Sequence, residues 1–180
     1  MATGESSQNV ERRRSIEKEL RRLEESAMYS AQIQFEQTKQ WRGVNLALGV
    51  PATLLAAISG TAALVNTSGR IAAGICALAS AAFGAILTTV NASHRMNQAA
   101  AAANAYLEIQ TAARQAREID LPHCSIEEAR SNLAELTARR DEQNKTAEVP
   151  NKRSYRKAQR NIEGGGQTYA VDENGSQGEE

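Results

Sequence analysis

Two uncharged stretches, Gly43 to Gly69 and Ile71 to Ser93, follow one another with only Arg70 between them. Charged residues make up 23% of this chain, so two such runs in succession are far outside what chance produces. A helix of about 20 apolar residues crosses the hydrocarbon core of a bilayer, and each stretch is long enough. Asn66 to Gly69 supplies turn residues between them. The pattern predicts a transmembrane helical hairpin with spans at about residues 44–65 and 71–90.

The segment before the hairpin predicts one long helix over residues 10–42, which contain no Pro or Gly. Its apolar side chains recur at helical spacing and form a single stripe on an otherwise charged helix. The stripe consists of Ile16, Leu20, Leu23 and Ala27. It predicts packing against another helix of the same chain, with a short coiled coil between two copies as the alternative.

Further helices are expected after the hairpin, so the predicted fold class is all-α. Residues 95–118 continue as helix until Leu121-Pro122 breaks it. Ser125 followed by Glu128 then has the spacing of a capping box that opens another helix. The apolar stripes of these helices match the N-terminal one and predict a small helical bundle.

The composition divides the chain into three parts. Residues 1–9 are polar and are predicted to be disordered. Residues 10–143 are predicted to form one helical domain with two transmembrane spans. Residues 144–180 are dominated by Lys, Asn, Glu, Gly and Gln, and predict a mostly disordered tail that is first basic, then Gly-rich and finally acidic.

Small residues recur at every fourth position in both predicted spans. Such residues let a second helix approach closely, so they predict helix packing and self-association. The candidate packing residues are Ala52, Ala56 and Gly60 in the first span and Ala73, Ala77 and Ala81 in the second.

A weakly polar stripe runs beside the second of these ridges, and it consists of Ser80, Gly84, Thr88 and Asn91. At 100° per residue these positions share one side of a helix. The stripe fits two interpretations, which are the lining of a water path in an oligomeric pore and a packing face that shares hydroxyl hydrogen bonds with another helix.

The ends of the spans carry candidate interface anchors, namely Trp41, Arg42 and Arg95. An indole ring followed by a cation suits the headgroup level of a bilayer. Lys39, Arg42 and Arg95 lie near the outer ends of the spans, whereas the hairpin loop carries only Arg70. The positive-inside tendency therefore predicts an integral protein of the inner or plasma membrane with both termini in the cytoplasm.

A basic cluster surrounds Tyr155 in the tail, and it consists of Lys152, Arg153, Arg156, Lys157 and Arg160. Beside a membrane such a cluster gathers anionic lipid, and otherwise it is a solvated segment. The formal net charge of the whole chain is zero, which argues against a nucleic-acid partner, because nucleic-acid binders carry a basic excess.

Nothing in the chain has the spacing of an active site, so we expect no enzyme activity, no catalytic residues and no cofactor. The chain has two His and two Cys. His123-Cys124 lacks a second pair of ligands, which argues against a metal site. Gly164 to Gly166 is not a phosphate loop, because no strand precedes it and no Lys-Ser/Thr follows.

The layout resembles that of the SLATT proteins, which are two-transmembrane effectors found with prokaryotic nucleotide second-messenger (SMODS) synthetases and SLOG sensor domains. The resemblance lies in a charged N-terminal helix, Trp41 before the first span, two closely spaced Gly/Ala-rich spans, and a helix from His94-Arg95 through Tyr106-Leu107. It implies an oligomeric, pore-forming antiviral defence effector that permeabilises the membrane of an infected cell, with a nucleotide-sensing partner protein. It implies no catalytic residues.

Two other functions fit the same residues. One is a non-conducting membrane anchor or scaffold whose cytoplasmic helices recruit a partner. The other is a soluble Ala-rich helical bundle, which is disfavoured because soluble hairpins of this length show a charged outer face. The lipid bilayer and further copies of the chain are therefore the expected partners.

Overall fold

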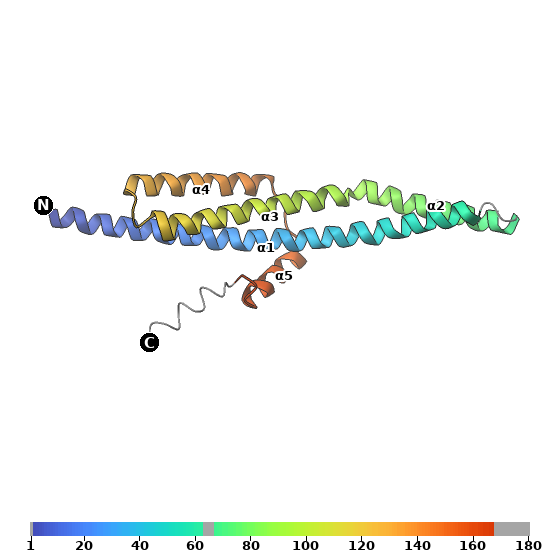
Figure 1. Cartoon of the computed structure of the whole chain (residues 1–180), viewed down its shortest axis with the longest axis horizontal. Coiled ribbons are helices and arrows are strands. Elements are labelled where there is room, and N and C mark those ends of the chain that lie inside the picture. Colours follow the sequence, from blue (N-terminus) through green and yellow to red (C-terminus); the bar gives the residue numbers. More distant parts are fainter. Residues whose placement is uncertain (1, 63–66, 168–180) are drawn as a thin grey trace. The chain divides into compact units, whose positions relative to one another are not determined.

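The computed structural model describes residues 2–62 and 67–167, with side chains described over residues 7–61 and 69–167. Within these ranges all regular structure is helical, which confirms the all-α prediction (Figure 1). The elements are α1 (Ala2–Ala62), α2 (Thr67–Val90), α3 (Ala92–Gln115), the π-helical turn η1 (Ala116–Asp120), α4 (Ile126–Thr146) and α5 (Lys152–Glu163).

Three helices extend into segments for which disorder was predicted. α1 begins at Ala2, within the polar residues 1–9, α4 ends at Thr146, just inside the tail 144–180, and α5 lies wholly inside that tail. Met1 and residues 168–180 lie outside the described residues, as do the predicted end of the first span near residue 65 and Asn66 of the predicted turn. The other predicted turn residues, Thr67 to Gly69, are instead the first residues of α2. α1 continues without interruption from the predicted N-terminal helix into the first span, with Pro51 inside it.

The contacts divide the chain into two units, where the sequence predicted one domain over residues 10–143. The bundle unit consists of Met1–Glu36 and Ala99–Glu180, and the hairpin unit consists of Gln37–Gln98. α1 and α3 each contribute residues to both units. The boundary between the units lies inside continuous helices. Helix periodicity in the sequence cannot locate such a boundary, because the same period continues on both sides of it.

The core of the bundle unit joins the apolar stripes predicted from the sequence. Leu20 of α1, Ile109 of α3 and Leu136 of α4 belong to one buried cluster. Tyr106 joins it, and the Ala residues between these large side chains allow the helices to approach closely. The expected packing of the N-terminal stripe against helices of its own chain is thereby confirmed.

The turn between α3 and α4 is fixed by polar contacts in the bundle unit. The guanidinium of Arg13 donates to the carbonyl oxygens of Leu121 and Cys124. These bonds satisfy carbonyl groups that the helix end would otherwise leave without partners. The predicted capping box is present: the Glu128 backbone N–H donates to Ser125 Oγ at 3.2 Å, and the Ser125 N–H donates to Glu128 Oε2 at 2.8 Å.

Polar side chains are buried in α1 near the end of the bundle unit. Gln32, Gln34 and Glu36 are buried. Gln34 Nε2 donates to the Glu148 carbonyl oxygen at 3.2 Å, and Gln167 Nε2 donates to Gln32 Oε1 at 3.1 Å. Hydrogen bonds therefore hold the segment after α4 against α1, whereas apolar contacts dominate in the core.

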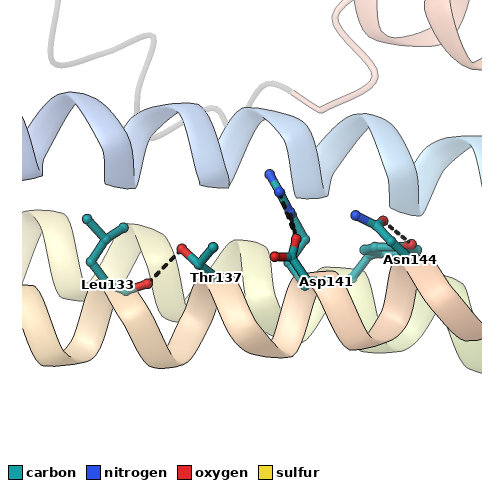
Figure 2. Close-up of polar contacts among 6 residues, drawn as sticks. Leu133, Thr137, Asp141 and Asn144 are labelled. Atoms are coloured by element: carbon teal, nitrogen blue, oxygen red, sulfur yellow. Dashed lines mark hydrogen bonds and ion pairs between the residues drawn. The ribbon is translucent and has the colours of Figure 1, made fainter.

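A second polar contact ties α3 to the end of α4. The Tyr106 hydroxyl donates to Asn144 Oδ1 at 2.8 Å (Figure 2). Burial raises the pKa of the Tyr106 phenol, while the charge of Arg140 acts in the opposite direction. The phenol therefore stays protonated and remains a hydrogen-bond donor at every physiological pH.

Candidate membrane interface and helix-association surface

The two helices of the hairpin unit meet along a seam at heptad spacing. The seam consists of the buried Ala73 and of partly buried residues, which are Trp41, Asn45, Leu48, Ala52, Leu55 and Ser59 in α1, and Gly69, Cys76, Ser80, Phe83, Leu87 and Val90 in α2. Alternating steps of four and three residues characterise two helices that stay in contact over their length. The hairpin unit is thus a short antiparallel helix pair.

Two side-chain hydrogen bonds cross the seam. Ser59 Oγ donates to the Ala73 carbonyl oxygen at 2.9 Å, and Ser80 Oγ donates to the Ala52 carbonyl oxygen at 2.7 Å. Both bonds fit one antiparallel register, because Ser59 lies one heptad after Ala52 and Ala73 lies one heptad before Ser80. Hydroxyl groups paired with backbone carbonyls suit an apolar solvent, where an unpaired hydroxyl is costly.

The predicted packing residues divide between the seam and the outer surface of the hairpin unit. Ala52 and Ala73 lie in the seam. By contrast, Ala56, Gly60, Ala77 and Ala81 are exposed. A Cβ atom added at Gly60 would meet nothing within 4 Å. The exposed members of both ridges are therefore available to another helix.

The weakly polar stripe divides in the same way. Ser80 and Gly84 are partly buried, whereas Thr88 and Asn91 are exposed. The Thr88 hydroxyl donates to the Gly84 carbonyl oxygen of its own helix at 2.9 Å. Asn91 has φ 51°, a left-handed conformation that ends α2 and that Asn tolerates better than most residues. The four positions therefore do not form one continuous face.

The predicted interface anchors come together in the hairpin unit. The guanidinium of Arg95 lies over the Trp41 ring, 5.0 Å from its centroid. This is a cation–π contact between the beginning of one predicted span and the end of the other. Arg42 is exposed. Trp41 and Arg95 therefore mark the same end of the hairpin.

The outer surface of the hairpin unit is apolar. Leu54 is 58% exposed and Leu78 is 75% exposed. Other large aliphatic side chains are exposed as well: Leu46, Val50, Ile58, Ile71, Ile75 and Ile86. Two helices are long and apolar enough to cross a membrane, and their most apolar windows are 0% and 6% buried. The core helix of a soluble protein would have its apolar window mostly buried.

The basic cluster lies on α5 of the bundle unit. Lys152, Arg153, Arg156 and Arg160 are exposed, and Lys157 is partly buried. The side chain of Asn151 caps the helix by accepting from the backbone N–H groups of Arg153 and Ser154. The cluster is therefore part of a folded helix that packs on the bundle.

Within the described residues, no group of three or more His, Cys, Asp or Glu side chains could hold a metal ion. Cys76 and Cys124 are free thiols. His123 and Cys124 border an open hollow with Asp120 and Glu128, and these side chains form no such group.

Comparison with protein-family models, curated proteins and solved structures found no match for this chain.

Sequence reasoning missed the hairpin seam and the contact between Trp41 and Arg95. A usable signal was present, because Leu48, Ala52, Leu55 and Ser59 follow the heptad spacing on their own. The small residues at every fourth position form a different pattern, which shares only Ala52 and Ala73 with the seam.

Proposed function

We propose that this chain is an integral membrane protein whose hairpin associates with further copies to form an oligomeric, pore-forming effector. The SLATT-like layout adds the setting, which is a prokaryotic defence system signalled by nucleotides through a sensing partner. The observation that carries the proposal is the arrangement of the hairpin unit. In this unit Leu and Ile side chains face outward, and the hydroxyls of Ser59 and Ser80 donate to backbone carbonyls between the two helices. Such an arrangement is favourable where the surrounding solvent is lipid.

Self-association is supported by the exposed small residues Ala56, Gly60, Ala77 and Ala81. Two spans cannot enclose a water path alone, so a pore requires several copies of the hairpin. Small side chains on the outer surface allow such copies to approach at backbone distance. The exposed Thr88 and Asn91 are the candidate lining, and Ser80 is assigned to the seam because its hydroxyl bonds to Ala52.

Alkaline carbonate extraction of membranes from cells that express the chain tests the membrane location. We expect the protein to stay in the pellet, because removal of peripheral contacts leaves a spanning hairpin in place. Recovery in the supernatant would contradict the proposal and favour the soluble bundle.

Gly60→Leu tests association separately from hairpin packing. We expect fewer copies per complex in membrane crosslinking, since a Leu side chain at this open position holds a second copy away. Gly49→Leu is the matched control within the same helix, because a Cβ atom at Gly49 lies 3.8 Å from Leu87 Cδ2 in the seam. Normal oligomers for Gly60→Leu would exclude this surface as the contact.

Ion flux from liposomes that contain the purified chain tests the pore, with candidate nucleotide messengers added in turn. We expect Thr88→Leu to lower the flux while insertion and copy number stay normal, because an apolar lining favours loss of water from the path. Ser80→Leu should instead disturb the hairpin seam. Flux that Thr88→Leu leaves unchanged would exclude this part of the stripe as the lining.

A non-conducting anchor is the second candidate, and a specific observation favours it. The bundle unit has its own buried core, which is independent of the hairpin unit and leaves a charged surface for partners. Liposomes that show no flux under any nucleotide, together with normal insertion and assembly, would support the anchor over the pore.

A further inference from the structure

The exposed face of α5 concentrates cations that the described part of the chain leaves without ion pairs. Arg22, Arg117, Arg139, Arg140 and Lys145 elsewhere in the bundle unit each have a carboxylate within 4 Å. Among the described residues, none of the five cations of α5 forms such a pair. The positive potential of this face is therefore directed outward.

The helix is held so that these cations stay together. Ser154 and Ala158 are both 0% exposed, and they lie one turn apart on the side that packs on the bundle. At 100° per residue, the four exposed cations fall within an arc of about 100° on the opposite side. These four, Lys152, Arg153, Arg156 and Arg160, are here named the basic face.

The position of the charges does not serve the stability of α5 itself. A helix gains from acidic residues in its first turn and basic residues in its last, because of the helix dipole. The first turn of α5 has no acidic residue, and it begins with Lys152 and Arg153. An anion bound at this end would remove the repulsion between these cations and the dipole.

The surroundings of the basic face fit a phospholipid headgroup. Lys152, Tyr155 and Arg156 line one hollow with Pro150 and Asn151. The phenol ring of Tyr155 is exposed beside two cations, and Val149 is exposed just before the helix. Phosphate groups pair with Lys and Arg, while Tyr rings and aliphatic side chains suit the boundary of the acyl region.

We propose that the basic face of α5 binds the anionic phospholipid headgroups of the bilayer that holds the hairpin. This inference rests on the proposed membrane location. Lipid is favoured over nucleic acid for two reasons. The chain has zero net charge, whereas nucleic-acid binders are basic as a whole. A spanning hairpin in the same chain also keeps lipid headgroups at high effective concentration.

The test uses the full chain in lipid nanodiscs, with a fluorophore on Gln159→Cys in a Cys76→Ala, Cys124→Ser background. An acceptor dye on the lipid headgroups reports whether α5 lies at the membrane surface. Nanodiscs of phosphatidylcholine alone are compared with nanodiscs that also contain phosphatidylglycerol. We expect energy transfer to rise with phosphatidylglycerol and to fall again at high salt, where charges are screened.

Arg153→Gln with Arg156→Gln and Arg160→Gln should lower the ratio of docked to free α5 by roughly 100-fold, at about fivefold for each cation. The matched control is Arg12→Gln with Lys18→Gln and Arg130→Gln, which removes the same charge from exposed positions elsewhere in the bundle unit. This control should keep the response to phosphatidylglycerol.

Three results would overturn the proposal: no response to phosphatidylglycerol in inserted wild-type chain, an equal loss in the control, and tighter binding of a single-stranded oligonucleotide that the triple variant abolishes. Flotation of the chain with neutral vesicles at alkaline pH reports insertion separately. A chain that fails to float but binds phosphatidylglycerol vesicles through the basic face would contradict the membrane-spanning proposal and leave the lipid site standing.

Discussion

The hairpin unit and the bundle unit are both built from packed helices, and they place their side chains in opposite ways. The bundle unit buries Leu20 and Ile109 and exposes most of its charged side chains, with the buried Glu36 as an exception. The hairpin unit exposes Leu54 and Leu78 and places Ser59 and Ser80 between its helices. If the hairpin lies in lipid, as proposed, neither unit turns its apolar side chains toward water, and the two units follow the same helix-packing rules in opposite solvents.

This contrast also explains what holds each unit together. Burial of apolar surface drives the bundle, at roughly 25 cal/mol for each Å² removed from water. In the proposed bilayer this driving force is absent from the hairpin, so close packing and hydroxyl bonds would hold its helices together. A substitution of one kind should accordingly have different consequences in the two units.

Leu54→Lys with Leu78→Lys is the strongest way to break the comparison. A Leu-to-Lys exchange near the centre of a span costs about 3 kcal/mol or more in insertion, so the pair should cost roughly 6 kcal/mol. Carbonate extraction should then find the variant in the supernatant. Ala134→Lys with Ala138→Lys, on the exposed side of α4, is the control and should stay in the pellet. Equal extraction of the two variants would mean that no lipid covers the hairpin.

Leu20→Ala should destabilise the bundle unit by about 2–5 kcal/mol, because it leaves a cavity at a side chain that is only 1% exposed. Denaturant unfolding of the detergent-solubilised chain, followed by circular dichroism, measures this change. Leu54→Ala is the matched substitution in the hairpin unit and should leave the same transition unchanged. A similar loss of unfolding free energy in both variants would contradict the proposal that burial of apolar side chains from water stabilises only the bundle unit.

Ser125→Ala should cost the bundle unit about 1 kcal/mol, since it removes half of the capping box at α4. Denaturant unfolding of the variant and of wild type measures this loss.

The same capping box predicts a dependence of stability on pH. Hydrogen bonds from the backbone and side chain of Ser125 lower the pKa of the Glu128 carboxyl. The contribution of the Glu128 carboxylate to the free energy of unfolding is therefore fully present above the pKa that this carboxyl has in the unfolded chain. It is lost as the pH falls through the lower pKa of the folded state. Unfolding of Glu128→Gln and wild type across acidic pH should show their difference shrinking toward zero.

Ser59→Ala and Ser80→Ala should have the smallest effect, at about 0.6 kcal/mol each, because hydroxyl bonds between membrane helices are weak individually. Disulfide trapping between cysteines introduced at Leu48 and Gly84, across the seam, should become slower in the double variant. Thr61→Ala is the control, since its hydroxyl bonds only to its own helix at Ala57 and Ile58. Identical trapping rates in all variants would show that these hydroxyl bonds do not stabilise the seam.

The sequence alone determined the helical class, the two apolar helices and the bundle stripes. Each depends on a local period or a local signal, such as Ile16 through Ala27, the break at Leu121-Pro122 and the capping box at Ser125. The helix α2 ends at Val90, and the position of the second span within it stays a prediction. The candidate packing residues could be predicted only as a group.

Tertiary structure decided which members of that group meet inside the hairpin. Ala52 and Ala56 have the same side chain and similar neighbours in sequence, yet Ala52 lies in the seam and Ala56 is exposed. Their difference arises from the register between α1 and α2, which depends on contacts such as Ser80 with Ala52. A helix period identifies the residues that share a face, and only the partner helix selects the face that is buried. The folding of α5 has the same cause, because Ser154 and Ala158 become a packing side only against the rest of the bundle unit.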